Sequence, residues 1–330
     1  MFEQAGRLSA IVRTNEDQLP CDKGPYIWDK SQHEESHEEG IGSTFQFRKP
    51  SLIAKHILNG TWIGSLINAH YPIAGDQSPY FGLSYSHCNF KSLEKYEKQK
   101  GLDFIYVPKE NTTSYIRNLK LKNSSVVVFE WEKLDEYHNY VAFDETFRSN
   151  FHQQRLLRPN LKRRPDEIWV SIHFRWGDVE TEDPNDPDAR TGLGFADYCQ
   201  CINGTLELNP KVSIFVFAEN FTPPESCTVL ESRQVSFFNA STSWQRDLDI
   251  MSQSQLLIGG QSSFFVLGAH LCKNCTAIHS SGKKFVQSAY EKKRLQPHLK
   301  SVYCIPQYIC YWTYIKEYLK KISPNKSDGS

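Results

Sequence analysis

The alternation of apolar runs with helical patterns after residue 165 constrains the fold of this chain more than any other feature. Each apolar run is short and is bounded by polar or glycine-containing segments, which is typical of buried strands. Strands that alternate with helices predict a parallel, doubly wound sheet, because the connecting helices then cover both of its faces. The predicted strands span 168–174, 212–217, 235–238 and 256–258, and the predicted helices span 247–254 and 262–271.

The first half of the chain predicts a second α/β domain. A helical pattern runs from Phe45 to Ile57, and apolar runs follow at 62–67, 104–107 and 126–131. The amphipathic pattern at 311–321 predicts a helix near the carboxyl terminus. We therefore expect two Rossmann-like domains with these boundaries: a polar tail at 1–38, an N-terminal domain at 39–160, a C-terminal domain at 161–310, and a final helix and tail at 311–330.

Asparagine triplets and cysteines indicate the compartment. The chain has eight Asn-x-Ser/Thr triplets, whereas its composition predicts about two by chance. It also has nine cysteines, which in an oxidising compartment indicate disulfides whose pairing the sequence leaves open. We expect a glycoprotein of the secretory pathway lumen, in the Golgi or the endoplasmic reticulum, or a secreted one. The triplets begin at Asn59, Asn111, Asn123, Asn203, Asn220, Asn239, Asn274 and Asn325.

Charge and hydropathy exclude some partners. The formal net charge is zero, which argues against a nucleic-acid partner. No stretch reaches the roughly 18 apolar residues that a membrane span needs, and residues 1–20 lack the apolar centre of a signal peptide. We expect any membrane attachment to use an N-terminal segment that precedes this sequence.

Polar residues that suit a nucleotide diphosphate follow the predicted strands. Arg175 comes directly after the first strand and can hold phosphate oxygens with its planar guanidinium. The segment Gly259-Gly260-Gln261-Ser262-Ser263 turns from the fourth strand into a helix, whose amino end favours phosphate. Asp247 opens the helix after the third strand. Parallel strands bring these groups to one edge of the sheet, where α/β proteins bind their ligands.

Three blocks resemble the GDP-fucose-dependent fucosyltransferases of the GT-B fold. Residues 172–178, Ile-His-Phe-Arg-Trp-Gly-Asp, are similar to their His-x-Arg-x-Gly-Asp motif. Residues 247–263 resemble their second block, and residues 40–46 resemble their amino-terminal Gly-x-Gly-Asn-Gln element. The resemblance implies a GT-B fold, in which two Rossmann-like domains face each other across a cleft. Trp176 and Ser43 depart from the family, which usually has a second Arg and an Asn there.

The resemblance also implies roles for these residues. Arg175 would be the catalytic residue at the β-phosphate, and transfer would invert the anomeric centre without a metal or any cofactor besides the GDP-sugar donor. The acceptor would be a hydroxyl of a glycan or glycoprotein, and no catalytic base is identifiable. The donor-binding residues would be His173, Asp247, Ser262, Ser263, Gly40, Gly42 and Ser43, with Gly177 and Asp178 as structural support.

Two alternatives stay open. Asp247-Leu248-Asp249 and Asp186-Pro187-Asp188 are Asp-x-Asp motifs, which a metal-dependent GT-A transferase would use to bind Mn²⁺ or Mg²⁺. The departures at Ser43 and Trp176 also allow a catalytically inactive GT-B-like module that binds a carbohydrate or a protein.

Overall fold

The structure is a computed structural model in which the described residues form two compact α/β units. The first unit comprises residues 1–35, 50–64 and 85–135, and the second comprises 36–49, 65–84 and 136–330. The described residues are 24–29, 41–63, 78–82, 102–108, 110–129, 138–158, 163–164, 166–175, 195–208, 211–219, 221–239, 244–260, 262–273, 275–281 and 301–306. Among them, no helix has the length and apolar character that crossing a bilayer requires.

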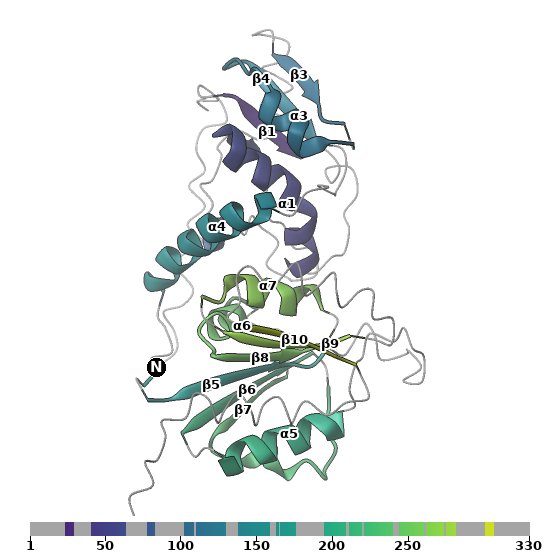
Figure 1. The fold of residues 1–330 in the computed structure, drawn as a ribbon. Coiled ribbons are helices and arrows are strands. Elements are labelled where there is room, and N and C mark those ends of the chain that lie inside the picture. The colour runs from purple at the N-terminus through teal and green to yellow at the C-terminus, as the bar shows by residue number, and fades with distance from the viewer. Residues whose placement is uncertain are drawn as a thin grey trace, which may run out of the picture. The chain divides into compact units, whose positions relative to one another are not determined.

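The first unit contains a parallel sheet with strand order β2-β1-β4-β3. Figure 1 labels β1, β3 and β4 of this sheet. Its strands are β1 (Tyr26–Asp29), β2 (Thr61–Ile63), β3 (Asp103–Tyr106) and β4 (Ser125–Phe129). Helix α1 (Ile41–Leu58) connects β1 to β2, and α3 (Thr112–Asn118) connects β3 to β4. The two connections are the strand-helix-strand units that parallel pairing requires.

Strand β1 corrects the prediction of a polar tail at residues 1–38. It pairs with both β2 and β4, so it lies inside the sheet rather than outside the fold. Tyr26, Ile27 and Trp28 are at most 3% exposed. This short apolar run was not recognised as a strand because polar segments flank it on both sides. Burial of such large side chains stabilises the sheet.

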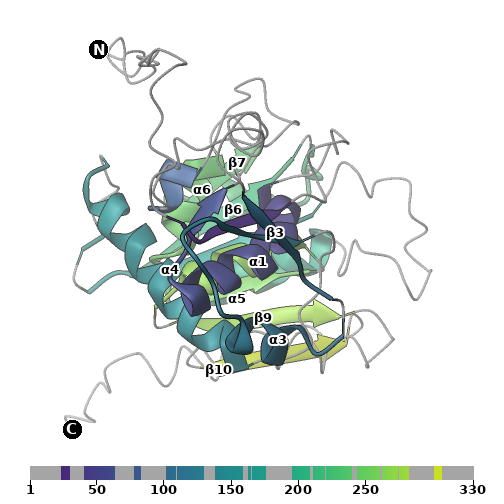
Figure 2. The same ribbon diagram turned by 90° about the horizontal axis from the view of Figure 1, so that it is seen from above.

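The second unit contains a six-stranded parallel sheet with the order β10-β9-β8-β5-β6-β7. Helix α5 (Phe195–Leu208) covers one face, and α6 (Trp244–Met251) and α7 (Ser263–Leu271) cover the other (Figure 1). Strands β9 and β10 lie side by side at one end of the sheet (Figure 2). The strands are β5 (Ile168–His173), β6 (Val212–Ala218), β7 (Val235–Asn239), β8 (Leu256–Gly259), β9 (Thr276–Ser281) and β10 (Ser301–Pro306).

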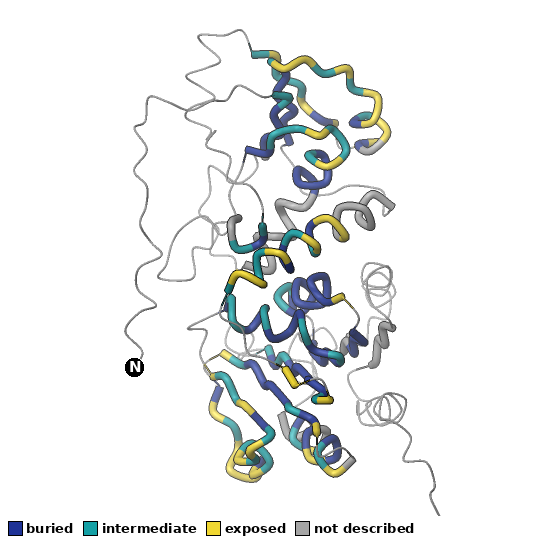
Figure 3. Tube along the Cα trace, turned by 90° about the vertical axis from the view of Figure 1, so that its left-hand side faces the viewer, coloured by how far each residue is buried: buried dark blue, intermediate teal, exposed yellow. Residues whose placement is uncertain are grey.

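This sheet confirms the predicted α/β class and the doubly wound arrangement. The four predicted strands and two predicted helices all form, with ends that shift by a few residues. Strand β5 is buried on both faces along most of its length, and β8 beside it is buried throughout, whereas the edge strand β7 has exposed residues. Buried residues of the chain are dark blue in Figure 3. The sequence did not assign α5, β9 or β10, and the predicted helix at 311–321 lies outside the described residues.

Helix α4 (His138–Leu156) and the short 3-10 helix η1 (Ser78–Phe81) belong to the second unit, although the sequence placed both in the N-terminal domain. The ring of Phe81 stacks on Phe147 of α4 at 5.4 Å and on Trp244 of α6 at 6.1 Å between centroids. These apolar contacts hold η1 and α4 against α6. The unit therefore includes segments on both sides of residue 160.

The Arg158 clamp, formed by Tyr80, Arg158 and Asp249, adds polar bonds to the same contact. Arg158 donates to both carboxylate oxygens of Asp249, from Nη2 at 2.7 Å and from Nε at 3.1 Å. It also donates to the carbonyl of Tyr80 at 3.0 Å and lies 4.1 Å above the Tyr80 ring. The Tyr80 hydroxyl lies 2.9 Å from Oδ1 of Asp249 and 2.7 Å from the carbonyl oxygen of Gln245, so its one proton is shared between these two acceptors. A guanidinium with a two-bonded carboxylate and a stacked ring is a strong arrangement.

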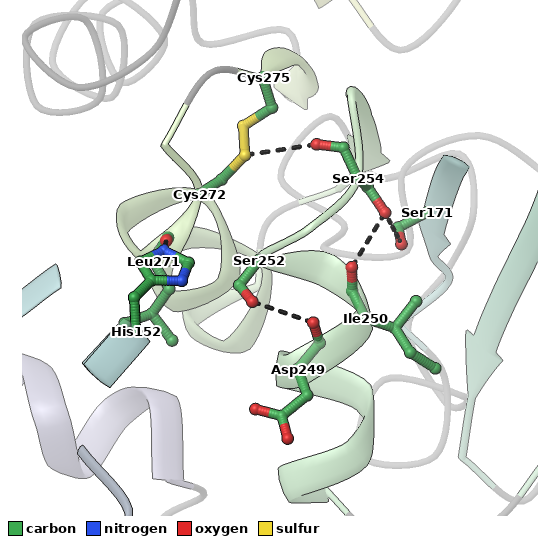
Figure 4. The surroundings of a disulfide bond; sticks show 9 residues. All are labelled: His152, Ser171, Asp249, Ile250, Ser252, Ser254, Leu271, Cys272 and Cys275. Carbon is green, nitrogen blue, oxygen red and sulfur yellow. Dashed lines mark hydrogen bonds between the residues drawn. A yellow bond between two sulfur atoms is a disulfide. The ribbon is translucent and has the colours of Figure 1, made fainter. Parts of the chain in front are cut away.

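His152 connects α4 to the carboxyl end of α7 (Figure 4). Its Nε2 donates to the carbonyl of Leu271 at 2.8 Å, and its Nδ1 accepts from Nε of Arg155 at 3.2 Å. Burial is the main cause that lowers the pKa of His152 to about 4, and the positive charges of Arg155, Lys273 and Arg148 contribute to the same shift, against the opposing bond to Leu271. The ring is therefore neutral at physiological pH.

Two disulfides occur among the described residues. Cys199 of α5 is bonded to Cys227, and Cys272 is bonded to Cys275 directly after α7 (Figure 4). The sequence predicted disulfides and left their pairing open, and the structure pairs these four cysteines. The Cys-x-x-Cys segment forms a disulfide here, and no described group of His, Cys, Asp or Glu residues is arranged to hold a metal ion.

We predict that Arg158→Ala lowers the free energy of unfolding by about 2–3 kcal/mol, because it leaves the Asp249 carboxylate, which is 16% exposed, without its cation. Urea unfolding followed by circular dichroism measures the change. Arg164→Ala is the matched control, since Arg164 is 76% exposed and its ion pair with Glu167 is long at 3.7 Å. Equal effects of the two substitutions would contradict the role of the clamp.

We predict that His152 makes stability fall as the pH drops from 6.5 toward 4. The unfolded chain protonates this imidazole near pH 6.5, whereas the folded chain resists protonation until about pH 4, so acid favours unfolding. The loss approaches about 3 kcal/mol at the acidic end. Unfolding curves of the wild type and of His152→Gln at several pH values measure it, and a difference between the two that stays constant from pH 7 to 4 would refute the prediction.

Candidate functional site

The carboxyl end of β5 lies at the point where the order of the sheet reverses. From β5 the chain proceeds through β6 and β7 on one side, and then through β8, β9 and β10 on the other. His173 is level with Gly259 of β8 and with Phe217 of β6, so the ends of three neighbouring strands meet there. Connections that leave in opposite directions open a crevice at such a switch point, which is where doubly wound sheets bind ligands.

Arg175 stands just beyond this strand end. Phe174 anchors it: the Phe174 backbone N–H donates to the carbonyl of Phe217 at 2.9 Å, and its ring is buried against Phe221 at 4.7 Å. Because Phe174 continues the β5 pairing by one residue, Arg175 leaves the sheet at the switch point, where it is half-buried. A cation held by a buried neighbour on a central strand is well placed to bind an anion.

His173 and the start of α7 lie together. The imidazole of His173 is 5.5 Å from the ring of Phe264, in the first turn of α7. Ser263 is the first residue of that helix, next to Phe264 in the chain. The structure thus brings two predicted donor-binding residues, His173 and Ser263, to the same corner of the sheet.

Ser262 has a local role that the sequence did not specify. It is the N-cap of α7, with extended backbone, and its hydroxyl accepts from the backbone N–H of Phe265 at 3.5 Å. Its own N–H donates to the carbonyl of Gly260 at 2.9 Å. The hydroxyl oxygen therefore satisfies the helix, as N-cap serines do, while its proton can still be donated to an anion.

Gly259 permits the close approach of α7 to β8. A Cβ at this position would lie 2.4 Å from the ring of Phe265. Any larger residue would push the first turn of α7 away from the sheet, and Ser262 and Ser263 would move with it. The glycine therefore sets the distance between the helix start and the end of β5, as in dinucleotide-binding folds.

Asp247 lies in the first turn of α6, where the sequence predicted an acidic residue, and its side chain is buried. Its Oδ1 accepts two hydrogen bonds from Arg246, at 3.0 Å from Nε and 2.9 Å from Nη2. The Arg246 guanidinium also lies 4.1 Å above the ring of Phe238 in β7. Helix α6 must cross the sheet, because it connects β7 to β8 on the far side of β5 and β6. Its first turn starts from the same edge as Arg175.

Burial raises the pKa of Asp247 to about 6, against the opposing effect of Arg246. The carboxylate is thus ionised at neutral pH at an energetic cost. A ligand that donates hydrogen bonds to it would offset part of this cost. Arg246 was not predicted as a site residue, although its position beside an acidic residue at a strand-to-helix turn could have indicated a cation there.

The Asp-x-Asp interpretation of residues 247–249 fails in the described structure. Asp247 pairs with Arg246, whereas Asp249 is held by Arg158 and Tyr80 in the clamp. Residues two apart on a helix point in different directions, so the two carboxylates do not converge on one ion. The second Asp-x-Asp motif, at residues 186–188, lies outside the described residues.

Five further predicted site residues lie outside the described residues or near the start of α1. Gly40, Gly177 and Asp178 lie outside the described residues, and Gly42 and Ser43 are described by their backbone alone, near the start of α1. The facing wall formed by residues 40–43 and the supporting turn at 177–178 remain predictions.

No protein-family model and no curated protein matches this chain. Solved structures of glycosyltransferases are similar to it at a low level. POFUT1 in complex with GDP-fucose is 9% identical over 88% of this chain and 99% of that chain, with a TM-score of 0.46. The E. coli heptosyltransferase WaaC with ADP is 12% identical over 86% and 97%, with a TM-score of 0.44. A family 9 glycosyl transferase from Veillonella parvula is 10% identical over 87% and 88%, with a TM-score of 0.39.

We predict that Asp247 makes stability fall as the pH rises from about 4 to 6. The folded chain keeps the Asp247 proton up to about pH 6, whereas the unfolded chain releases it near 3.8, so deprotonation favours unfolding. The change is about 2–3 kcal/mol. Asp247→Asn abolishes this component, which is measured as the difference between wild-type and variant unfolding free energies at each pH. A difference that does not vary between pH 4 and 7 would contradict the buried, ion-paired environment.

Proposed function

We propose that this chain is an inverting, metal-independent glycosyltransferase of the GT-B type that transfers a sugar from a GDP-sugar to a hydroxyl of a glycan or glycoprotein. The observation that supports it most is the meeting of Arg175, His173 and the start of α7 at the switch point of the second sheet. The choice of L-fucose as the sugar rests on the resemblance of residues 172–178 to the fucosyltransferase motif.

Each group at this edge suits one part of the donor. Negative charge grows on the β-phosphate as the sugar leaves, and Arg175 together with the amino end of α7 would stabilise it. His173 lies beside that helix start and would contact the nucleotide. Asp247 would accept hydrogen bonds from the N1–H and N2–H₂ edge of guanine, which needs a carboxylate in its ionised form.

The proposed transfer is a displacement at the anomeric carbon in which no redox step and no metal take part. The acceptor oxygen would attack the anomeric carbon on the side opposite to GDP, the bond from that carbon to the β-phosphate oxygen would break, and the hydroxyl proton would pass to a base or to solvent. Attack from the opposite side inverts the anomeric configuration. The described residues do not identify the base.

A lumenal location in the Golgi or endoplasmic reticulum, or secretion, belongs to the same proposal. The disulfides Cys199–Cys227 and Cys272–Cys275 support it, because such bonds persist in oxidising compartments. GDP-sugars serve as donors for transferases in that lumen, so compartment and donor are consistent.

We predict that Arg175→Lys lowers GDP release from GDP-fucose at least 100-fold while the fold is retained, because an ammonium group cannot reproduce the two-bonded contact with phosphate. The measurement is GDP release from a panel of GDP-, UDP- and ADP-sugars, in EDTA and in Mn²⁺. Circular dichroism and the unfolding midpoint monitor the fold.

The matched control is Arg233→Lys, an exposed arginine before β7, which should act like the wild type. Wild-type turnover by Arg175→Lys would refute the role of Arg175. Activity that appears only with Mn²⁺ would favour a metal-dependent transferase, and failure to bind GDP with Arg175 intact would favour a non-catalytic module.

A further inference from the structure

Five of the Asn-x-Ser/Thr triplets begin at described residues, and all five asparagines are exposed. Two roles of an exposed asparagine leave different contacts: one that serves the fold does so through its backbone or amide, whereas a glycan acceptor leaves its amide without a partner in the protein. The contacts of each residue separate these cases. The five are Asn59, Asn111, Asn123, Asn203 and Asn239.

Backbone conformation accounts for two of them. Asn59 and Asn111 have φ angles of 49° and 54°, in the left-handed region that asparagine tolerates better than most residues. Asn59 follows the last residue of α1, and the next N–H, of Gly60, donates to the carbonyl of Lys55 at 3.2 Å. This is a common way for a helix to end, so Asn59 has a folding role.

Side-chain contacts account for two more. Nδ2 of Asn203 donates to Glu207 at 2.8 Å, one turn further along α5. Oδ1 of Asn239 accepts from the backbone N–H of Phe221 at 2.8 Å, which links the ends of β6 and β7. In both residues the amide is already engaged by the protein.

Asn123 has neither a left-handed backbone conformation nor a side-chain hydrogen bond among the described residues. The local turn is held by its neighbours, because the backbone N–H of Lys122 donates to the hydroxyl of buried Ser125 at 3.0 Å. The Asn123 carbonyl, which any residue would supply, approaches Gly24 so closely that a Cβ there could not fit.

We propose that Asn123 carries an N-linked glycan. In this reaction Nδ2 of Asn123 attacks the anomeric carbon of an oligosaccharide held on a lipid diphosphate. The new carbon–nitrogen bond replaces the carbon–oxygen bond to the diphosphate, and an amide proton is lost as the lipid diphosphate leaves. The proposal requires passage through the secretory pathway but does not depend on any transferase activity of this chain.

The position in the first unit is compatible with a bulky sugar. Asn123 lies two residues before the start of β4, so it is at the amino ends of the parallel strands, beside Gly24 before β1. Ligands of α/β sheets bind at the opposite, carboxyl ends. A glycan at the amino edge therefore leaves the carboxyl edge of this sheet open.

The test is site mapping on the full chain, directed into the secretory pathway of cultured animal cells by a cleavable signal. Peptide N-glycosidase F in ¹⁸O-water converts an occupied asparagine to labelled aspartate, which mass spectrometry assigns to a residue. We expect the label at residue 123, and Asn123→Gln should lose the mass of one glycan. Ser125→Thr is the matched control, since it keeps both the triplet and the hydroxyl that binds Lys122.

An unlabelled peptide spanning residue 123, whether or not other triplets are labelled, would overturn the proposal. Because occupancy is read on the wild-type chain, the result does not depend on the stability of a variant. It is also independent of the GDP-sugar assay, so either proposal can fail alone.

Discussion

Strand β5 pairs with β8 on one side and with β6 on the other, and this pairing determines where the groups of the candidate site stand. The shared register places His173 beside Gly259, and one further residue of pairing at Phe174 directs Arg175 out of the sheet. A shift of one residue would exchange the two faces of the strand and change where Arg175 leaves the sheet. The chemistry at this edge thus depends on backbone hydrogen bonds rather than on any single side-chain contact.

Helices and strands were predicted correctly where the apolar residues were numerous enough to show a helical or strand spacing. Strands β5, β6, β7 and β8 and helices α6 and α7 were predicted because apolar runs and helical patterns alternate clearly there, whereas α5 was not predicted. Strand β1 was missed, since only Tyr26, Ile27 and Trp28 mark it within a polar segment. Helix α4 was missed as part of the second unit because its contacts with η1 and α6 are tertiary, and no local pattern in the sequence reveals them.

For the site, the residue types were predictable and their partners were not. Polar residues directly after strands identified Arg175 and the start of α7, because parallel topology determines where strand ends go. The ion pair of Asp247 with Arg246, and the different one of Asp249 with Arg158, depend on side-chain directions on α6. The sequence shows two acidic residues two positions apart, whereas the helix gives them separate environments.

The interleaving of the two units has a practical consequence for dissecting the molecule. The second unit takes η1 and α4 from regions on both sides of a stretch that belongs to the first. A fragment that starts at residue 161 would contain every strand of the larger sheet, yet it would lack Tyr80, Phe81 and Arg158. Helix α6 would then expose Trp244 and an unneutralised Asp249, so that such a fragment should aggregate rather than behave as an autonomous domain.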